Sequence, residues 1–166
     1  PPDTLVDDSL PWLVLKPGTA TNSHEEDRQA WSIHPGVDLD RHSVAVRDRA
    51  ARFSRDLGLA ESLAAAVTMA AFRHDTGKSD RRFQVRLGQD GQVPLAKSVF
   101  TSAQAARRAW AKSDLGSGWR HEHRSACHAW LELQERDGAD LVVRLVGASH
   151  GHGRGVALAS SASLTS

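Results

Sequence analysis

The sequence predicts a mostly α-helical fold in which several helices pack into one bundle. In several segments apolar residues recur at three- and four-residue spacing, the pattern of helices that bury one face. No segment of useful length alternates between polar and apolar residues as a half-buried strand does. Residues that start and stop helices, such as Asp38 and Gly58, flank the apolar segments.

The composition is that of one domain in a reducing compartment. With 166 residues the chain is long enough to bury a core of its own. Its single cysteine, Cys127, allows neither an internal disulfide nor a zinc cluster of thiolates, so we expect a cytoplasmic protein. No apolar run is long enough for a membrane span, and no membrane partner is expected. The 21 basic and 20 acidic residues nearly balance, so any contact with nucleic acid requires a local basic patch.

The first part of the chain leads into the domain. We expect residues 1–30 to form an approach or linker segment and residues 31–166 to form the domain. Within the linker, residues 11–15 favour a short strand that Pro17-Gly18 ends. Because the chain begins with Pro1 and not with Met, we expect it to be trimmed or excised from a longer protein.

Two helices come next. The first is expected from about residue 42 to residue 57, with Asp38, Asp40 or Ser43 as its cap and Gly58 as its stop. The second is expected from about residue 61 to residue 74. Its buried stripe consists of Leu63, Ala64, Ala66, Val67, Ala70 and Ala71.

The rest of the chain predicts shorter helices separated by turns. A basic helical stretch over residues 78–87 has Phe83 and Leu87 as its apolar anchors. Turns or loops are expected over residues 88–94 and 114–118, and helices over residues 102–112, 121–136 and 139–149. The serine-rich tail from Val156 predicts no element.

Five consecutive residues, His74-Asp75-Thr76-Gly77-Lys78, stand where the second helix stops. Packing rarely requires adjacent histidine and aspartate, whereas at a helix end they offer an imidazole nitrogen and a carboxylate to metal ions in a cleft. Gly77 supplies a break in the backbone just past the helix, and Lys78 places a cation beside the metal. The simpler explanation, an ion pair at a helix end, does not account for Gly77 and Lys78.

Other histidines among the nine of this chain also fall at helix ends. His42 opens the first helix, His121 opens a later one and His150 closes the last. Imidazole and carboxylate ligands without thiolate suit zinc, manganese, iron, cobalt or nickel, whereas magnesium prefers mostly oxygen. Two ions that share Asp75 as a bridge would form a two-metal site, which generates a hydroxide and stabilises both oxygens of an in-line displacement at phosphorus.

The remaining histidines and the basic stretch have plainer explanations. A lone histidine is more often a cap or surface residue than a ligand, and we assign His24, His34 and His128 to that class; His123 points away from His121. Residues Arg81, Arg82 and Arg86 form a solvated helix face, which becomes a backbone-contact surface if a phosphodiester site lies beside it.

Three stretches, taken in order, resemble a known family. They are Phe72-Arg73-His74-Asp75-Thr76-Gly77-Lys78 followed by Arg82-Phe83-Gln84, then Trp119-Arg120-His121-Glu122 with Ser125, then Ser149-His150-Gly151-His152-Gly153-Arg154. They are similar to the motifs of the HD superfamily of metal-dependent phosphohydrolases. More narrowly, they resemble the HD nuclease domain of the CRISPR helicase–nuclease that degrades DNA in type I interference. The last stretch and Leu95-Ala96-Lys97-Ser98 favour the subtype with the HD domain C-terminal to the helicase. The resemblance covers residues 40–155 and implies an HD-domain helical bundle.

The resemblance also implies roles for individual residues. His42, His74 and Asp75 would hold one metal, and Asp75 would bridge to a second metal held by His121 and His150. Lys78 would lie beside the scissile phosphate and stabilise its developing charge. The cofactors would be one or two divalent transition metal ions (Mn, Fe, Co or Ni, with Mg as a further option). Arg81, Arg82 and Arg154 would contact nucleic acid.

The chain departs from the family pattern at two points. Many relatives have two consecutive histidines before the final glycine, whereas this chain has Ser149-His150, so His152 is a further candidate ligand. Relatives also supply a later aspartate to the first metal, and no aspartate follows Gly155 here. The fourth ligand of the first metal is therefore left open.

The resulting expectation is a metal-dependent nuclease that hydrolyses phosphodiester bonds of single-stranded DNA in CRISPR interference. Its partners would be the CRISPR helicase domain and a DNA-bound surveillance complex. Two other readings remain open. One is an HD phosphohydrolase acting on small nucleotides in an enclosed pocket; the other is a metal-poor HD module that serves only for docking.

Overall fold

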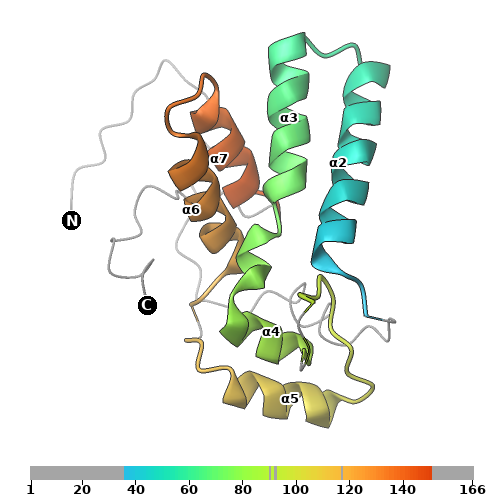
Figure 1. The fold of residues 1–166 in the computed structure, drawn as a ribbon, viewed down its shortest axis with the longest axis vertical. Helices are drawn as coiled ribbons and strands as arrows, with labels where there is room; N and C mark the ends of the chain where they lie inside the picture. The colour runs from blue at the N-terminus through green and yellow to red at the C-terminus, as the bar shows by residue number, and fades with distance from the viewer. Residues whose placement is uncertain (1–35, 90, 92, 117, 151–166) are drawn as a thin grey trace, which may run out of the picture.

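The computed structural model describes residues 36–89, 91, 93–116 and 118–150, and this part of the chain is helical (Figure 1). Its elements are α2 (Leu39–Asp56), α3 (Glu61–Arg73), the 3₁₀ helix η1 (Thr76–Ser79), α4 (Arg81–Leu87), α5 (Ala103–Lys112), α6 (His121–Leu133) and α7 (Ala139–Gly147). The only β pairing among these residues is an isolated bridge between Asp38 and Leu95. The mostly α fold class is thus confirmed. None of the described helices is long and apolar enough to cross a membrane.

The bundle is built from two antiparallel helix pairs, α2 with α3 and α6 with α7, and α3 packs against α7 (Figure 1). Left-handed glycines stand in both connections, Gly58 at φ 64° and Gly138 at φ 78°, where other residues would be strained. The core between the pairs consists of small and branched side chains that let the helices approach closely: Ala66, Ala70, Ala126, Ala129, Leu133, Ala139, Val142 and Val146.

This pairing decides where the site lies. In an antiparallel pair, the first residue of one helix and the last residue of its neighbour share an end. The start of α2, the end of α3, the start of α6 and the end of α7 therefore meet at one end of the bundle (Figure 1). η1, α4 and α5 continue from that end. The chain thereby brings the histidine-bearing helix ends together, although His42 and His150 are far apart in sequence.

Several boundaries differ from the sequence expectation for local reasons. Helix α2 begins at Leu39, earlier than expected, because the Asp38 carboxylate accepts a hydrogen bond from Arg41 N at 2.8 Å and caps it. The expected helix over residues 78–87 is divided, because Asp80 accepts from Arg82 N and starts α4 anew after η1. Helix α7 ends at Gly147, so His150 follows that helix and does not close it. The linker, the strand at residues 11–15 and the serine-rich tail lie outside the described residues.

Candidate metal centre

Asp75 lies at the centre of the site. It follows α3, precedes η1 and is 2% exposed, so its carboxylate is held away from solvent. A buried carboxylate is stable only when cations or hydrogen-bond donors surround it. Its two oxygens face two different groups of histidines, as the sequence predicts for a bridging ligand.

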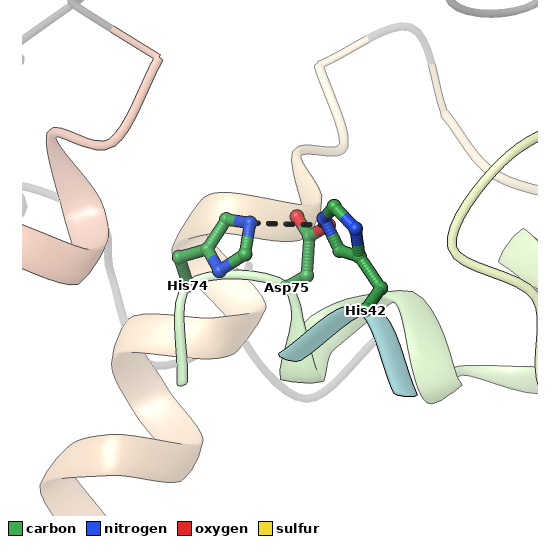
Figure 2. Close-up of side chains that lie close together, drawn as sticks. All are labelled: His42, His74 and Asp75. Carbon is green, nitrogen blue, oxygen red and sulfur yellow. Dashed lines mark ion pairs between the residues drawn. The ribbon is translucent and has the colours of Figure 1, made fainter. Parts of the chain in front are cut away.

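The first group joins α2 to the end of α3. Nε2 of His42 lies 3.5 Å from Asp75 Oδ2, and Nε2 of His74 lies 3.3 Å from the same oxygen. Figure 2 shows the two imidazoles on either side of the carboxylate, each with its Nε2 directed at it. His42 sits in the first turn of α2 and His74 caps the end of α3. These three side chains can hold one metal ion between them.

The second group joins the start of α6 to the segment after α7. Nε2 of His121 lies 3.3 Å from Asp75 Oδ1 and 2.8 Å from Nε2 of His150. The His121 and His150 rings meet edge to face, with their centroids 4.7 Å apart. Asp75, His121 and His150 form a second set that can hold a metal ion, and Asp75 belongs to both sets.

The residues present fit divalent cations. Oδ1 of Asp75 is buried and has no hydrogen-bond partner among the described residues, an arrangement that is costly unless a cation faces the atom. Two donors bound at about 2.1 Å to a common ion lie about 3.0–3.4 Å apart at octahedral or tetrahedral angles. The spacings from Asp75 to His42, His74 and His121 fall close to that range. Imidazoles and one carboxylate suit transition metals better than magnesium.

The electrostatics keep Asp75 ready to bind a cation. Burial alone would raise the pKa of Asp75, but the contacts with His121, His42 and His74 and the charge of Lys78 hold it well below its ordinary value. Burial of His74 opposes its charged form, yet the hydrogen bond and charge of Asp75 outweigh burial and raise the pKa of His74. Burial, followed by the neighbouring His121, lowers the pKa of His150. Asp75 is therefore an anion over the physiological range.

One ring is already oriented for coordination. Nδ1 of His74 lies 2.8 Å from the carbonyl oxygen of Ala71, an acceptor, so Nδ1 carries the proton in the neutral ring. The lone pair then resides on Nε2, the atom that faces Asp75. Such a backbone contact to the far nitrogen of a ligating histidine fixes its tautomer and ring orientation.

Lys78 is placed differently from a surface cation. Its ammonium donates to Asp75 Oδ2 at 2.8 Å and to the carbonyl oxygen of Ala96 at 3.2 Å, and the residue is buried. The sequence expectation that Lys78 brings a cation to the metal-binding residues is in keeping with this geometry. The shorter of its two hydrogen bonds is the one to Asp75, the carboxylate that both sets share.

Glycine is required at position 77 for a different reason from the backbone break that the sequence suggests. It lies within η1 and is not among the positive-φ residues, so it does not supply a left-handed helix stop. A Cβ at this position would lie 2.1 Å from the backbone oxygen of His121 and 2.8 Å from Ser125 N. Its own N–H donates to Ser125 Oγ at 2.8 Å. Glycine is needed because η1 presses against the first turns of α6, which carry His121.

Two residues that the sequence did not mark as functional, Gln84 and Phe83, support the site. Gln84 is buried and donates to the carbonyl oxygens of Lys78 at 2.6 Å and Leu95 at 3.0 Å, while it accepts from Leu95 N at 2.7 Å. It thereby ties η1 and α4 to the segment that carries Ala96. The Phe83 ring lies 5.4 Å from the His121 ring, centroid to centroid. Their signal in the sequence was their place after the His-Asp motif.

The remaining candidates among the described residues belong to neither metal-binding set. Arg81 is exposed on α4, and Arg82 pairs with Asp80 at 3.1 Å. Arg86 does not lie on a solvated face: it is buried, stacks over Trp110 and donates to Ser113 and Leu115. Among the described residues, neither His123 nor His128 belongs to a metal-binding set. His24, His34, His152 and Arg154 lie outside the described residues.

The comparisons with known proteins agree with this geometry. A family model described as "Cas3, HD domain" matches residues 38–164, which is more than half of the chain. No curated protein and no solved structure gave a significant match.

Proposed function

This chain belongs to the family of Cas3 HD domains, and we propose that it hydrolyses phosphodiester bonds of single-stranded DNA in CRISPR interference. Membership of the family implies a metal-dependent nuclease role in CRISPR systems. The substrate and the step in interference are our proposal. One observation carries it: a single buried carboxylate, that of Asp75, presents one oxygen to His42 and His74 and the other to His121.

The proposed site uses five side chains. His42, His74 and Asp75 would hold one divalent ion, and Asp75, His121 and His150 would hold the other. When bound, such ions supply an activated water and offset negative charge on the phosphodiester. The chain itself contributes a rigid cradle, because the ligands stand on the ends of packed helices and His74 is locked by Ala71. Manganese, iron, cobalt and nickel are the favoured ions, and magnesium is a further option.

Lys78 and the arginines complete the proposal. We assign Lys78 to the neighbourhood of the scissile phosphate, where its charge would add to that of the ions. This is supported by the position of its ammonium, 2.8 Å from the carboxylate at which both metal-binding sets meet. Arg81 and Arg82 are the first two residues of α4, which follows η1 after Asp80. We propose that Arg81, Arg82 and Arg154 contact the DNA. His152 is a further candidate ligand of the second metal.

The proposed partners follow from the family. A Cas3 HD domain works beside a CRISPR helicase, and a DNA-bound surveillance complex would deliver the strand. We place this domain C-terminal to its helicase, in keeping with the motifs at residues 95–98 and 149–154.

The test is cleavage of a labelled single-stranded DNA by chelator-treated protein supplied with Mn, Co, Ni, Fe or Mg. We expect cleavage that requires a transition metal, and a loss of at least about a hundredfold in Asp75→Asn, since even outer ligand contacts are worth 10–100-fold. The matched control is Asp140→Asn, which removes an exposed carboxylate from the first turn of α7.

Other outcomes would replace the proposal. Hydrolysis of nucleotides with intact single-stranded DNA would indicate a small-molecule phosphohydrolase. No metal uptake and no cleavage would indicate a docking module.

A further inference from the structure

We propose that Glu122 is a positioning residue that holds His121 in the ring orientation and tautomer needed to bind the second metal ion, an inference that rests on the proposed function. Glu122 is the second residue of α6 and is buried, with 6% of its surface exposed. It belongs to neither of the metal-binding sets. A buried carboxylate at that place needs a role.

The observation is a pair of buried atoms that face each other without other partners. Within the described residues, Nδ1 of His121 and Oε2 of Glu122 are both buried and both lack a hydrogen bond. The distance between them is 3.6 Å, slightly beyond hydrogen-bond range. A buried polar atom without a hydrogen-bond partner is costly, because it has lost its contacts with water. A small side-chain rotation that shortens this distance by a few tenths of an ångström would give both atoms a partner in one charge-assisted hydrogen bond.

The other nitrogen of the ring is already engaged. Nε2 of His121 faces Asp75 Oδ1 at 3.3 Å and Nε2 of His150 at 2.8 Å, so it is the atom directed at the second metal-binding set. It can bind a cation only if its lone pair is free, which requires the proton to reside on Nδ1. Glu122 offers the acceptor that keeps the proton there.

The rest of the surroundings supports a fixed ring. The Phe83 ring packs against the His121 ring, and His121 is 1% exposed, so water does not compete for Nδ1. Glu122 follows His121 in the first turn of α6, so the same short stretch of backbone carries both side chains. The same contact has its counterpart in the first metal-binding set, where the Ala71 carbonyl accepts from Nδ1 of His74. Each set would then have one histidine whose proton is placed by a neighbour.

The test compares Glu122→Leu, Glu122→Gln and the control Glu135→Gln, which alters an exposed glutamate just beyond α6. The ¹⁵N imidazole shifts of His121 are measured in metal-free protein under mildly alkaline conditions, and its signals are identified by their loss in His121→Gln. We expect one Nδ1–H tautomer in the wild type and in Glu135→Gln, and a tautomer mixture in Glu122→Leu. Glu122→Gln retains an acceptor oxygen and should largely restore the single tautomer.

Metal titration by calorimetry supplies the second readout. One of the two metal equivalents, that of the set containing His121, should bind manganese 10–100-fold more weakly in Glu122→Leu, with Glu122→Gln in between. An unchanged His121 tautomer in folded Glu122→Leu would overturn the inference. So would complete loss of one metal equivalent in Glu122→Gln, because that identifies Glu122 as a ligand itself. Wild-type protein that binds no divalent metal would contradict the proposed function, while the tautomer would still decide whether Glu122 positions His121.

Discussion

Lys78 and Asp75 form a buried ion pair, in which Nζ of the lysine lies 2.8 Å from Oδ2 of the aspartate and both side chains are at most 5% exposed. Removing water from two charges is costly, and attraction between them repays the cost only with good geometry and further hydrogen bonds. The Ala96 carbonyl supplies one such bond to Lys78. Three imidazoles face the carboxylate from the other sides. The pair therefore helps to keep ionised the carboxylate that the two candidate metal-binding sets share.

The first prediction separates the two halves of this pair. Asp75→Asn leaves the buried Lys78 ammonium without the negative charge of its carboxylate partner, and should lower the free energy of unfolding by about 3–5 kcal/mol. Lys78→Met should cost less, because His42, His74 and His121 still face Asp75. Asp75→Asn/Lys78→Met should be more stable than the sum of the single losses predicts. Urea unfolding of the four metal-free proteins measures this; strictly additive losses would contradict a coupled pair.

The second prediction concerns the contact between η1 and α6. Gly77→Ala places a methyl group 2.1 Å from the backbone oxygen of His121, so α6 must shift. Overpacking of this kind costs about 1–3 kcal/mol, and here the shift also moves a ligand. We expect lower stability in denaturant and weaker metal binding together. Gly116→Ala is the control, since a Cβ there meets nothing within 4 Å. Wild-type metal affinity in Gly77→Ala would show that His121 tolerates the shift.

The sequence predicts most of the helices, and it singles out the side chains that the structure brings together, for a physical reason. Helices such as α3 and α6 are encoded by local spacing of apolar residues, which is readable without the fold. The site residues are recognisable because a His-Asp pair has little use in packing. Both metal-binding sets contain only residues that the sequence identified, namely His42, His74, Asp75, His121 and His150.

The remaining features depend on contacts between distant segments. The need for glycine at position 77 arises from its contact with α6, where its hydrogen-bond partner Ser125 lies 48 residues later in the sequence. The burial of Lys78 depends on the Ala96 carbonyl, and that of Arg86 on Trp110 and Leu115. No local pattern contains these partners. The split between η1 and α4 differs from the expected continuous helix over residues 78–87, although its signal is local, because Asp80 is a residue type that caps helices.

The third prediction tests the Gln84 clasp, the three hydrogen bonds by which the Gln84 side chain joins Lys78 and Leu95. Gln84→Leu keeps the side-chain volume but leaves Leu95 N and the carbonyl oxygens of Lys78 and Leu95 without this partner. Each unsatisfied buried group costs about 1–3 kcal/mol, so a clear loss of unfolding free energy is expected. Because Gln84 accepts from Leu95 N and Ala96 is the next residue, hydrogen exchange should become faster at Leu95 and Ala96. Gln104→Leu, at an exposed position of α5, is the control and should change neither quantity. Unchanged exchange at Leu95 in Gln84→Leu would contradict the clasp.

The fourth prediction is a dependence of stability on pH that arises at the start of α4. Burial raises the pKa of Asp80, but its hydrogen bonds with the side chain and backbone of Arg82 outweigh burial and lower it below the ordinary value of 3.8. A carboxyl whose pKa is lower in the folded state stabilises the protein above its unfolded pKa, and this stabilisation is lost as pH falls through the folded pKa. Asn caps a helix about as well as Asp but carries no charge for Arg82. Asp80→Asn should therefore be less stable than the wild type near neutral pH, and the difference should shrink as the pH falls below about 4. Unfolding by urea at several pH values, with Asp140→Asn as an exposed control, measures the difference; a gap that stays constant on acidification would assign the role of Asp80 to capping alone.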